Sequence, residues 1–466
     1  MPITNLRDKV ETIVILMLEN RSFDHMFSFL TLGSPGTPAR RADIDGIRSL
    51  VDERYVNVWN TKPCVPWLTN DDALIADLPH GRELVSVQLR GTKDETAEFT
   101  MGGFAEAYSE ESGFAAVDET AAAPMSIQSA PWMMDYFAQH HMVCDRWFAP
   151  LPTDTQPNRL MALSGVTKYD TTVGRVITQG DLVFDWLTER KISWRVYRQG
   201  LPFEALIKSM WDDVVNPRRF RSIKDLIIDI LDDQKPFPSV VFLEPAFSDA
   251  PGKLGYQSND DHPPTAIGQG QQFLREAYAT LSANPKRWKK TVMIVTYDEH
   301  GGFYDHVEPI PVTAKPPKGA NWTAGEFKST GIRVPAVIAS PLVEIGSVYH
   351  EPLDHTSILQ FIASVFGKKN EVYSPEVDDR RNQGIGNVAD ALNSDVPRTK
   401  IPPPPETAPM SAGATKATGA VIPEGFTVKK GENAKAFEAA AKQLAKAKPK
   451  EVQQQYKEIV QWLNTD

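Results

Sequence analysis

The sequence predicts an α/β fold in which a mostly parallel sheet is sandwiched by helices and followed by a C-terminal helical extension. Two short apolar runs, residues 13–18 and 291–297, have the length and the polar boundaries of buried strands. Segments with helical spacing alternate with further strand-like runs, which is typical of a parallel sheet covered on both faces. The 466 residues and the hydrophobic share of 41% are enough for a large core.

The predicted elements alternate in order along the chain. Residues 101–104 open a segment that is predicted as a helix or a mobile flap, and residues 130–141 form a predicted helix because Trp132, Met133 and Tyr136 recur at helical spacing. A proline-rich loop is predicted over residues 148–159. The later predicted elements are a helix that begins within 160–163, a helix over 180–190, strands over 192–197 and 239–243, a helix over 266–281, a strand over 334–339, and a helix capped at Asp354 that runs through Ile362.

The chain divides into a predicted catalytic domain over residues 1–393, a linker over 394–428 and a helical extension over 429–466. Four consecutive prolines at 402–405 mark the linker and predict an extended backbone. The extension is rich in Ala, Lys and Gln, and it packs either on the body or on a partner. A lysine-rich helix there suits transient contact with an anionic membrane surface, and a solvated packing helix is the plainer alternative.

The overall charge excludes one class of partner. With 50 Lys and Arg against 60 Asp and Glu, the net charge is −10, so we expect no nucleic-acid partner. No apolar run approaches the roughly 18 residues of a membrane span. The polar start carries no signal peptide, which predicts a cytoplasmic protein as written, or a secreted or periplasmic one if a leader was removed. Cys64 and Cys144 could form one bridge or remain unbridged.

Oxygen-bearing side chains follow both of the clearest predicted strands. Glu19 and Asn20 end the first strand, and Asp298 and Glu299 end the strand over 291–297. In open α/β sheets, ligands bind at the carboxyl ends of strands. Four oxygen ligands suit a divalent ion such as Ca²⁺, Mg²⁺ or Mn²⁺, and nearby histidines extend the choice to Zn²⁺ or Fe. Solvent-facing polar residues at strand ends are the alternative for either pair alone.

A hydroxyl with polar neighbours lies in the proline-rich loop. Thr155 opens Thr-Gln-Pro-Asn-Arg, in which Asn158 offers an amide and Arg159 offers a guanidinium fork that matches phosphate oxygens. A base or a metal is needed to activate such a hydroxyl as a nucleophile. Thr153 is a competing hydroxyl, and a simple turn with a capping threonine is the alternative interpretation.

Histidines gather in loops among Asp, Gly and Pro residues rather than on apolar stripes. They are His80, His262, His300 and His306. Each one alone is more often a surface residue or a satisfied buried one, but beside an acid cluster they predict proton donors and phosphate contacts.

Taken together, these motifs resemble the phosphoesterase family that includes bacterial and plant non-specific phospholipases C and related acid phosphatases. The resemblance covers about residues 10 to 370. It rests on Glu-Asn-Arg-Ser-Phe-Asp-His at 19–25, Met-Gly-Gly-Phe at 101–104, Thr-Gln-Pro-Asn-Arg at 155–159, Asp-His-Pro at 261–263, Tyr-Asp-Glu-His-Gly-Gly-Phe-Tyr-Asp-His-Val at 297–307, Arg-Val-Pro-Ala-Val-Ile-Ala-Ser-Pro from 333, and Asp-His-Thr-Ser from 354.

The resemblance implies an alkaline-phosphatase-like core and a role for each motif residue. It makes Glu19, Asn20, Asp298 and Glu299 the metal ligands and Thr155 the nucleophile that takes the phosphoryl group, and it places His80 and His262 at the phosphate and the leaving group. A His-His pair that bacterial phosphocholine-type members and the phosphatases often carry is absent from residues 202–220. In that respect the chain is closer to the plant-like members.

The sequence therefore predicts a metal-dependent phospholipase C. It would hydrolyse glycerophospholipids such as phosphatidylcholine to diacylglycerol and a phosphorylated headgroup, through a phosphothreonine intermediate in which Asn158 or Arg159 holds the phosphoryl oxygens. An acid phosphatase of the same family, acting on soluble monoesters, is the nearest alternative. A non-catalytic metal-binding effector is the alternative of another class, and the intact set of motif residues disfavours it.

Overall fold

The structure is a computed structural model that describes most of the chain. The described residues are 5–33, 38–59, 61–70, 73–74, 76–112, 122–252, 257–406 and 430–465. The predicted linker over 394–428 therefore lies partly outside the described residues.

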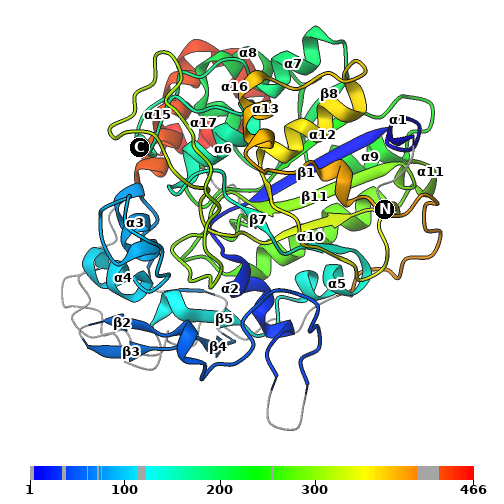
Figure 1. The fold of residues 1–466 in the computed structure, drawn as a ribbon. Helices are drawn as coiled ribbons and strands as arrows, with labels where there is room; N and C mark the ends of the chain where they lie inside the picture. The colour runs from blue at the N-terminus through cyan, green and yellow to red at the C-terminus, as the bar shows by residue number, and fades with distance from the viewer. Residues whose placement is uncertain are drawn as a thin grey trace.

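An eight-stranded sheet forms the centre of the molecule, as Figure 1 shows. Its strand order is β13-β6-β12-β11-β1-β10-β8-β9. The strands are β1 (Thr12–Leu18), β6 (Met142–Cys144), β8 (Trp194–Arg198), β9 (Phe220–Ser222), β10 (Val240–Glu244), β11 (Thr291–Tyr297), β12 (Ala336–Ala339) and β13 (Val348–Tyr349). All neighbouring pairs are parallel except the two that β12 makes, with β11 and with β6. The predicted mostly parallel sheet is confirmed.

Strand β1 lies between β10 and β11 and is buried along its whole length. This explains its composition, since a strand covered on both faces has no polar face to alternate. Its parallel pairing with β11 runs in register from Thr12 opposite Thr291 to Leu18 opposite Tyr297. Because the two strands end together, the residues that follow them start from the same edge of the sheet.

Helices cover both faces of the sheet, with α10 and α12 on opposite sides of β1 and β11 (Figure 1). Helix α10 packs with α5 and α9, and helix α12 packs with α6, α13 and α14. The bounds are α5 (Trp132–His140), α6 (Thr155–Ser164), α7 (Val183–Glu189), α9 (Asp225–Leu231), α10 (Ile267–Ser282), α11 (Pro285–Trp288), α12 (Thr356–Phe366), α13 (Pro375–Asn382) and α14 (Val388–Ala391). Within the described ranges, none of the helices combines the length and the apolar character that a membrane span requires.

A small lobe with its own hydrophobic cluster adjoins the carboxyl edge of the sheet, at the lower left of Figure 1. It contains α3 (Arg82–Arg90), α4 (Phe104–Ser112), β2 (Asn57–Trp59), β3 (Lys62–Cys64), β4 (Trp67–Thr69) and β5 (Ser126–Gln128). Phe303 and Tyr304, which follow β11, belong to this cluster and join the lobe to the sheet. The segment predicted as a helix or a flap is helix α4.

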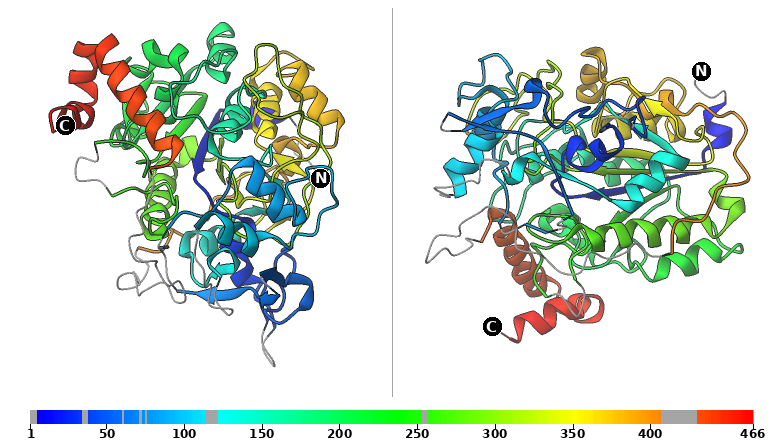
Figure 2. Two further views of the ribbon diagram at one scale, coloured as in Figure 1. Left: turned by 90° about the vertical axis from the view of Figure 1, so that its left-hand side faces the viewer. Right: turned by 90° about the horizontal axis from the view of Figure 1, so that it is seen from below.

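The C-terminal helices pack on the body, as one of the predicted alternatives expects. They are α15 (Glu432–Ala447), α16 (Pro449–Gln455) and α17 (Lys457–Leu463), and Figure 2 shows them against the outside of the body. Phe437 of α15 stacks near Phe247 with ring centroids 5.4 Å apart, and Arg198 pairs with Glu458 at 3.0 Å. The boundaries of the three predicted domains stay a prediction.

The structure also bears on the predicted loop before α6 and on the two cysteines. The loop predicted over 148–159 is wrong at its end, because α6 begins at Thr155 and includes Pro157. Proline is tolerated there because the first N–H groups of a helix have no intrahelical partner. Cys64 and Cys144 are both buried and form no bridge with one another.

Candidate functional site

The carboxyl ends of β1 and β11 bring the four predicted metal ligands to one place. Glu19 and Asp298 leave the sheet side by side, because Leu18 and Tyr297 are paired. The Asn20 backbone N–H donates to Asp298 Oδ1 at 3.1 Å and ties the two strand ends together. Asn20 has φ of +64°, a left-handed conformation that asparagine adopts more readily than most residues. The parallel register thus creates a site that neither strand contains alone.

Hydrogen bonds hold one oxygen of Asp298 and one oxygen of Glu299, and the other oxygen of each accepts no hydrogen bond from a described residue. Asp298 Oδ1 accepts from the backbone N–H of Asn20 and of Glu299. Glu299 Oε2 accepts from the Gly301 N–H at 2.8 Å and lies 3.0 Å from His300 Nδ1. Asp298 Oδ2 and Glu299 Oε1 make no hydrogen bond to any described residue. The backbone therefore fixes both carboxylates and leaves one oxygen of each available.

In Glu19 and Asn20, neither of the two polar side-chain atoms makes a hydrogen bond to a described residue. Both side chains are fully buried, and neither is hydrogen-bonded within the described part of the chain. An unpaired buried polar group costs about 1–3 kcal/mol, so a folded protein rarely keeps several together without a ligand. A divalent cation that prefers oxygen ligands would satisfy these atoms. The residues present therefore fit a metal centre.

Arg159 lies against Glu19 and Asp298 at the ends of β1 and β11. Its Nη2 donates to the carbonyl oxygens of Met17 at 3.2 Å and Leu18 at 3.3 Å. Its Nε lies 3.2 Å from Glu19 Oε1 and 3.4 Å from Asp298 Oδ2. The side chain is only 3% exposed. The guanidinium is thus engaged with the strand end, whereas the sequence predicted that it holds phosphoryl oxygens.

Burial and neighbouring charges shift the pKa values of the three carboxyl groups in different directions. Burial raises the pKa of Glu19 well above its usual value, and the Arg159 charge offsets this only in part. Burial also raises the pKa of Asp298 to about 6, again against Arg159. Burial alone would raise the pKa of Glu299, but the His80 charge and neighbouring hydrogen bonds outweigh it and lower that pKa. The three carboxyl groups thus have different electrostatic surroundings, with Arg159 beside Glu19 and Asp298 and His80 acting on Glu299.

Thr155 stands in the first turn of α6, between two residues that reach the site. Arg159 follows it by four residues and so lies on the same face of the helix. The charge of Asp154, which precedes it, helps to raise the pKa of His80, so Asp154 lies near that ring. The N-terminus of a helix presents N–H groups and the positive end of the helix dipole, which favours an anion. The backbone at the start of α6 therefore suits an anionic group, and the role of the Thr155 hydroxyl stays a prediction.

Asn158 holds the loop before α6. Its Oδ1 accepts from Leu151 N at 2.9 Å, and its Nδ2 donates to the carbonyl oxygens of Leu151, Thr153 and Asp154. The competing hydroxyl of Thr153 donates to the Asp170 carbonyl at 2.8 Å. Both side chains are engaged within the loop, so we revise the role expected of Asn158 from phosphate contact to support of Thr155.

His80 and His262 face one another across Asp77. Their ring centroids are 6.2 Å apart, and Asp77 Oδ2 lies 4.0 Å from His80 Nδ1 and 3.9 Å from His262 Nε2. In each ring Nδ1 contacts a backbone carbonyl, that of Leu78 or of Pro263, which fixes the ring and leaves Nε2 for another partner. Burial opposes it, but the surrounding acids raise the pKa of His80 to about 9 and that of His262 to about 10.

The other two predicted histidines are committed elsewhere. His300 Nε2 contacts Gln88 Oε1 at 2.7 Å, and His300 Nδ1 contacts Glu299, so this ring supports a ligand carboxylate. His306 Nδ1 contacts Asp24 Oδ2 at 2.6 Å in a separate network. The expectation that every loop histidine serves the phosphate is therefore narrowed to His80 and His262.

In the described part of the chain, two groups of acids and histidines are compact enough to hold a metal ion. One group is Asp77, His80 and His262, and the other is Asp24, Asp305 and His306. Within each group, the possible ligand atoms lie within 4.8 Å of one another. The predicted set at the ends of β1 and β11 is not one of them. Its Glu19 and Asp298 have the Arg159 Nε between them. We nevertheless favour the predicted set, because all four of its side chains carry buried oxygens that accept no hydrogen bond from a described residue.

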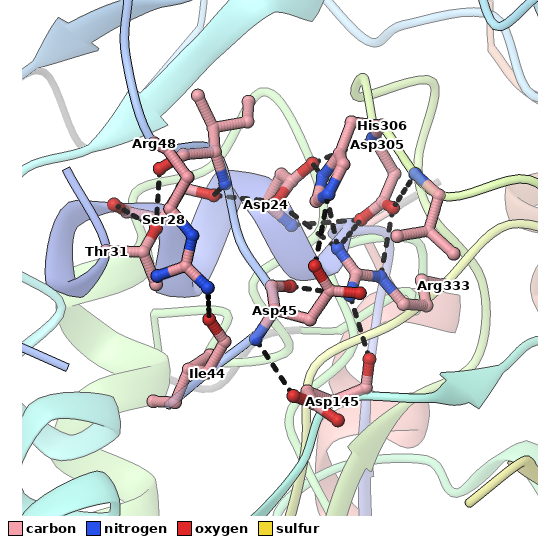
Figure 3. A network of polar contacts seen from close by, with 12 residues as sticks. Asp24, Ser28, Thr31, Ile44, Asp45, Arg48, Asp145, Asp305, His306 and Arg333 are labelled. Atoms are coloured by element: carbon pink, nitrogen blue, oxygen red, sulfur yellow. Dashed lines mark hydrogen bonds and ion pairs between the residues drawn. The ribbon is translucent and has the colours of Figure 1, made fainter. Parts of the chain in front are cut away.

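Figure 3 shows the second group as part of a network around Arg333. The guanidinium lies 3.0 Å from Asp305 Oδ1 and 3.3 Å from Asp24 Oδ1. Asp24 Oδ1 also accepts from Ser28, and its Oδ2 accepts from the His306 N–H. Asp305 Oδ2 accepts from the Asp24 N–H. Since every carboxylate oxygen here has a donor, this group is a structural brace.

Sequence reasoning missed two features of this region. Asp77 was not predicted as a site residue, although its position three residues before His80 was a usable signal. The Arg333 network was also missed, although its members lie in motifs at 19–25, 297–307 and 333–341. Sequence spacing could not show that these motifs meet.

The chain is similar to one protein family over most of its length and to several phospholipases C. The model of the phosphoesterase family matches residues 10–369. Non-specific phospholipase C1 of Arabidopsis thaliana is 31% identical over 394 residues, covering 78% of this chain and 68% of the relative. Non-specific phospholipase C6 of Arabidopsis thaliana is 28% identical and covers 88% of this chain and 78% of the relative. Non-hemolytic phospholipase C of Burkholderia pseudomallei is 25% identical and covers 86% and 61%.

Similarity to solved structures is weaker. The lipoteichoic acid synthase LtaP from Listeria monocytogenes matches with a TM-score of 0.35 and 10% identity, covering 96% of this chain and 93% of that chain. A protein of the alkaline phosphatase superfamily from Vibrio parahaemolyticus matches with a TM-score of 0.31 and 12% identity, covering 52% of this chain and 61% of that chain.

Proposed function

This chain belongs to the phosphoesterase family and is a phosphoric ester hydrolase, and from that premise we propose that it is a metal-dependent phospholipase C. Its proposed substrates are glycerophospholipids such as phosphatidylcholine, which it would hydrolyse to diacylglycerol and a phosphorylated headgroup. The names of the relatives support this class of substrate. The observation that carries the proposal is the set of buried oxygens without partners at the ends of β1 and β11.

In the proposed centre, Glu19, Asn20, Asp298 and Glu299 hold a divalent ion. The ion, when bound, supplies Lewis-acid stabilisation of charge on the phosphoryl group. Oxygen ligands suit Ca²⁺, Mg²⁺ or Mn²⁺, and the nearby His80 and His262 extend the choice to Zn²⁺. The hydrogen bonds to Asp298 and Glu299 support this role, because they orient each carboxylate and leave one oxygen of each available.

The proposed reaction is an in-line displacement at phosphorus by Thr155. The Thr155 hydroxyl gives up its proton to solvent, and its Oγ forms a bond to phosphorus while the bond from phosphorus to the diacylglycerol oxygen breaks. His262 or His80 gives a proton from Nε2 to the leaving alkoxide. Water then attacks the phosphothreonine and gives a proton to the same histidine, while the bond from phosphorus to the Thr155 Oγ breaks and the phosphorylated headgroup is released. The Thr155 Oγ takes a proton back from solvent. The position of Thr155 at the N-terminus of α6 supports this role, since helix N–H groups favour the phosphoryl charge.

A panel of phosphoesters tests the substrate class and the metal together. The protein is treated with a chelator and assayed with phosphatidylcholine and with small monoesters, each after separate addition of Ca²⁺, Mg²⁺, Mn²⁺ or Zn²⁺. We expect metal-dependent release of diacylglycerol. Activity confined to small monoesters would instead identify a phosphomonoesterase, and inactivity on the whole panel with metal-loaded protein would favour a non-catalytic effector.

Two threonine variants test the nucleophile. Thr155→Ala is expected to abolish turnover and to leave the fold intact. Thr153→Ala is the matched control, because its hydroxyl is engaged with the Asp170 carbonyl. Near-normal activity of Thr155→Ala would contradict the assignment.

A further inference from the structure

Arg159 has a position that its predicted role does not explain. Its Nε lies 3.2 Å from Glu19 Oε1 and 3.4 Å from Asp298 Oδ2, and neither oxygen accepts a hydrogen bond from a described residue. Building on the metal centre of the proposed function, we propose that Arg159 is the resident counter-cation of that centre. It offsets the negative charge of Glu19 and Asp298 when the centre holds no ion, and it stays beside them as a positive charge when the centre holds one.

The guanidinium is fixed in this position from several sides. Its Nη2 donates to the Met17 and Leu18 carbonyl oxygens of β1. The guanidinium carbon lies 5.4 Å from the centre of the Phe203 ring and 4.9 Å from that of Phe247. Cation–π contacts of this length stabilise a buried guanidinium. Arg159 would have to give up these contacts to reach a substrate. It therefore acts on the carboxylates of the centre and not on the substrate.

Arg159 offsets negative charge on the Glu19 and Asp298 side of the centre. Glu19, Asp298 and Glu299 bring three negative charges into a fully buried space. The His80 charge acts on Glu299, whereas the Arg159 guanidinium lies against Glu19 and Asp298. Without the ion, Arg159 is the cation in contact with both Glu19 and Asp298 among the described residues, which is the pairing that buried charges require.

A second pair of carboxyl groups lies near the same guanidinium. Glu204 and Glu244 line a small cavity of about 30 Å³ together with Arg159 and Phe203. Burial raises the pKa of both groups, which favours their neutral forms. Glu244 Oε2 accepts from the Phe203 N–H at 3.0 Å. The charges of this pair act on Arg159 less strongly than those of Glu19 and Asp298, which the guanidinium contacts directly.

Thermal unfolding of the full-length protein, with chelator and with saturating Mn²⁺, tests the counter-cation. Arg159→Gln removes the charge, and Arg159→Lys keeps it. For Arg159→Gln we expect a large fall in Tm in chelator and a smaller fall with Mn²⁺, so the Mn²⁺-induced rise in Tm exceeds that of the wild type. Titration should show Mn²⁺ binding that is about tenfold tighter or more, since a positive charge beside the ion is gone. Arg159→Lys should respond to Mn²⁺ as the wild type does.

Arg333→Gln is the matched control, because Arg333 is equally buried but pairs with Asp24 and Asp305 away from the centre. Its Tm should fall equally with and without Mn²⁺. The inference is overturned if Mn²⁺ raises the Tm of Arg159→Gln by no more than it raises the Tm of the wild type. That result, together with a raised KM, is what a role of Arg159 in binding the substrate phosphate predicts. It is also overturned if Arg159→Gln cannot be recovered folded even with Mn²⁺ while Arg159→Lys can.

Failure of the proposed function has a different signature. If the wild type gains no stability from Mn²⁺, Ca²⁺, Mg²⁺ or Zn²⁺, the metal centre itself is refuted and the counter-cation with it. If the wild type responds to metal but both arginine variants respond in the same way as the wild type, the counter-cation alone is refuted.

Discussion

Two buried arginines at the carboxyl edge of the sheet, Arg159 and Arg333, each contact two buried carboxylates, and the two clusters differ in how completely those carboxylates are hydrogen-bonded. Around Arg333, both oxygens of Asp24 and of Asp305 have donors. Around Arg159, Glu19 has no hydrogen bond at either oxygen among the described residues, and Asp298 has none at Oδ2. The same residue types thus build a closed network in one place and an open one in the other.

The difference separates a structural role from a binding role. A closed network of buried charges is stable without a further partner, because each charge is already paired and hydrogen-bonded. An open network keeps a cost in free energy that only a ligand removes. Proximity of acids and histidines alone would have selected the Asp24 group as a metal site. Hydrogen-bond completeness points to the strand-end group instead.

The largest expected effect comes from changing one ligand of the open cluster. Glu299→Gln keeps the shape of the side chain and the bond from Gly301 N–H, but removes the charge. We expect activity to fall by about 10²–10³-fold, since an electrostatic contact to the reacting group is weakened. Assays with metal and thermal unfolding with and without Mn²⁺ measure this. Asp24→Asn is the control, and it should lose stability but keep its response to Mn²⁺. An unchanged Mn²⁺ response in Glu299→Gln would remove it from the centre.

The next largest effect is a loss of stability when the closed cluster around Arg333 is broken. Arg333→Gln leaves Asp24 and Asp305 buried without their cation, so we expect a loss of about 3–5 kcal/mol in the free energy of unfolding. Urea unfolding, with and without Mn²⁺, measures it. Equal losses in the two conditions support the role as a brace. A loss below about 1 kcal/mol would show that the hydrogen bonds around the carboxylates carry the network without the arginine.

The closed cluster also predicts a pH dependence. Burial opposes it, but the Asp24 charge and the hydrogen bonds with Asp24 and Asp45 raise the pKa of His306 to about 9, against 6.5 for an unperturbed histidine. Protonated His306 therefore contributes stability that is fully present below pH 6.5 and is lost as the pH rises through about 9, by up to about 3 kcal/mol. Arg333 and Asp305 also face this ring and are held constant in the comparison.

Urea unfolding between pH 6 and pH 10 measures this contribution as the difference between the wild type and His306→Gln. The difference should be largest at the acid end and shrink above pH 9. His80 and His262 titrate in the same window but are present in both proteins, so they cancel. A difference that stays constant across the range would show that the charge of His306 does not stabilise the fold.

The smallest expected effect tests whether the C-terminal helices support the open cluster. Gln156, next to Thr155, donates through Nε2 to Asn433 Oδ1 at 3.1 Å, and Asn433 Nδ2 donates to Asp249 Oδ2 at 3.0 Å. Loss of these bonds in Asn433→Ala should lower kcat/KM by about 3–10-fold, as expected for one or two hydrogen bonds that position a neighbour. Gln461→Ala, on the exposed side of α17, is the control and should have no effect. Equal activity of the two variants would show that α15 only packs on the body.

Much of the fold could be predicted because its signals are local. The apolar run that becomes β1 and the one that becomes β11 are each bounded by polar residues, and the helix α10 shows its apolar spacing directly. The start of α6 could not be read in the same way. Pro157 suggested a loop, but the first turn of a helix needs no N–H from that position.

The sequence by itself determined the α/β class, the buried strands and the polar residues at their ends, because hydrophobic periodicity and chain order are properties of short segments. Tertiary structure alone decided which charges meet. Arg159 and Glu19 are 140 residues apart, and Arg333 and Asp24 are 309 residues apart, yet each pair is in contact. The physical reason is that a buried charge is defined by its partners and by the absence of water, and only the packed chain supplies both.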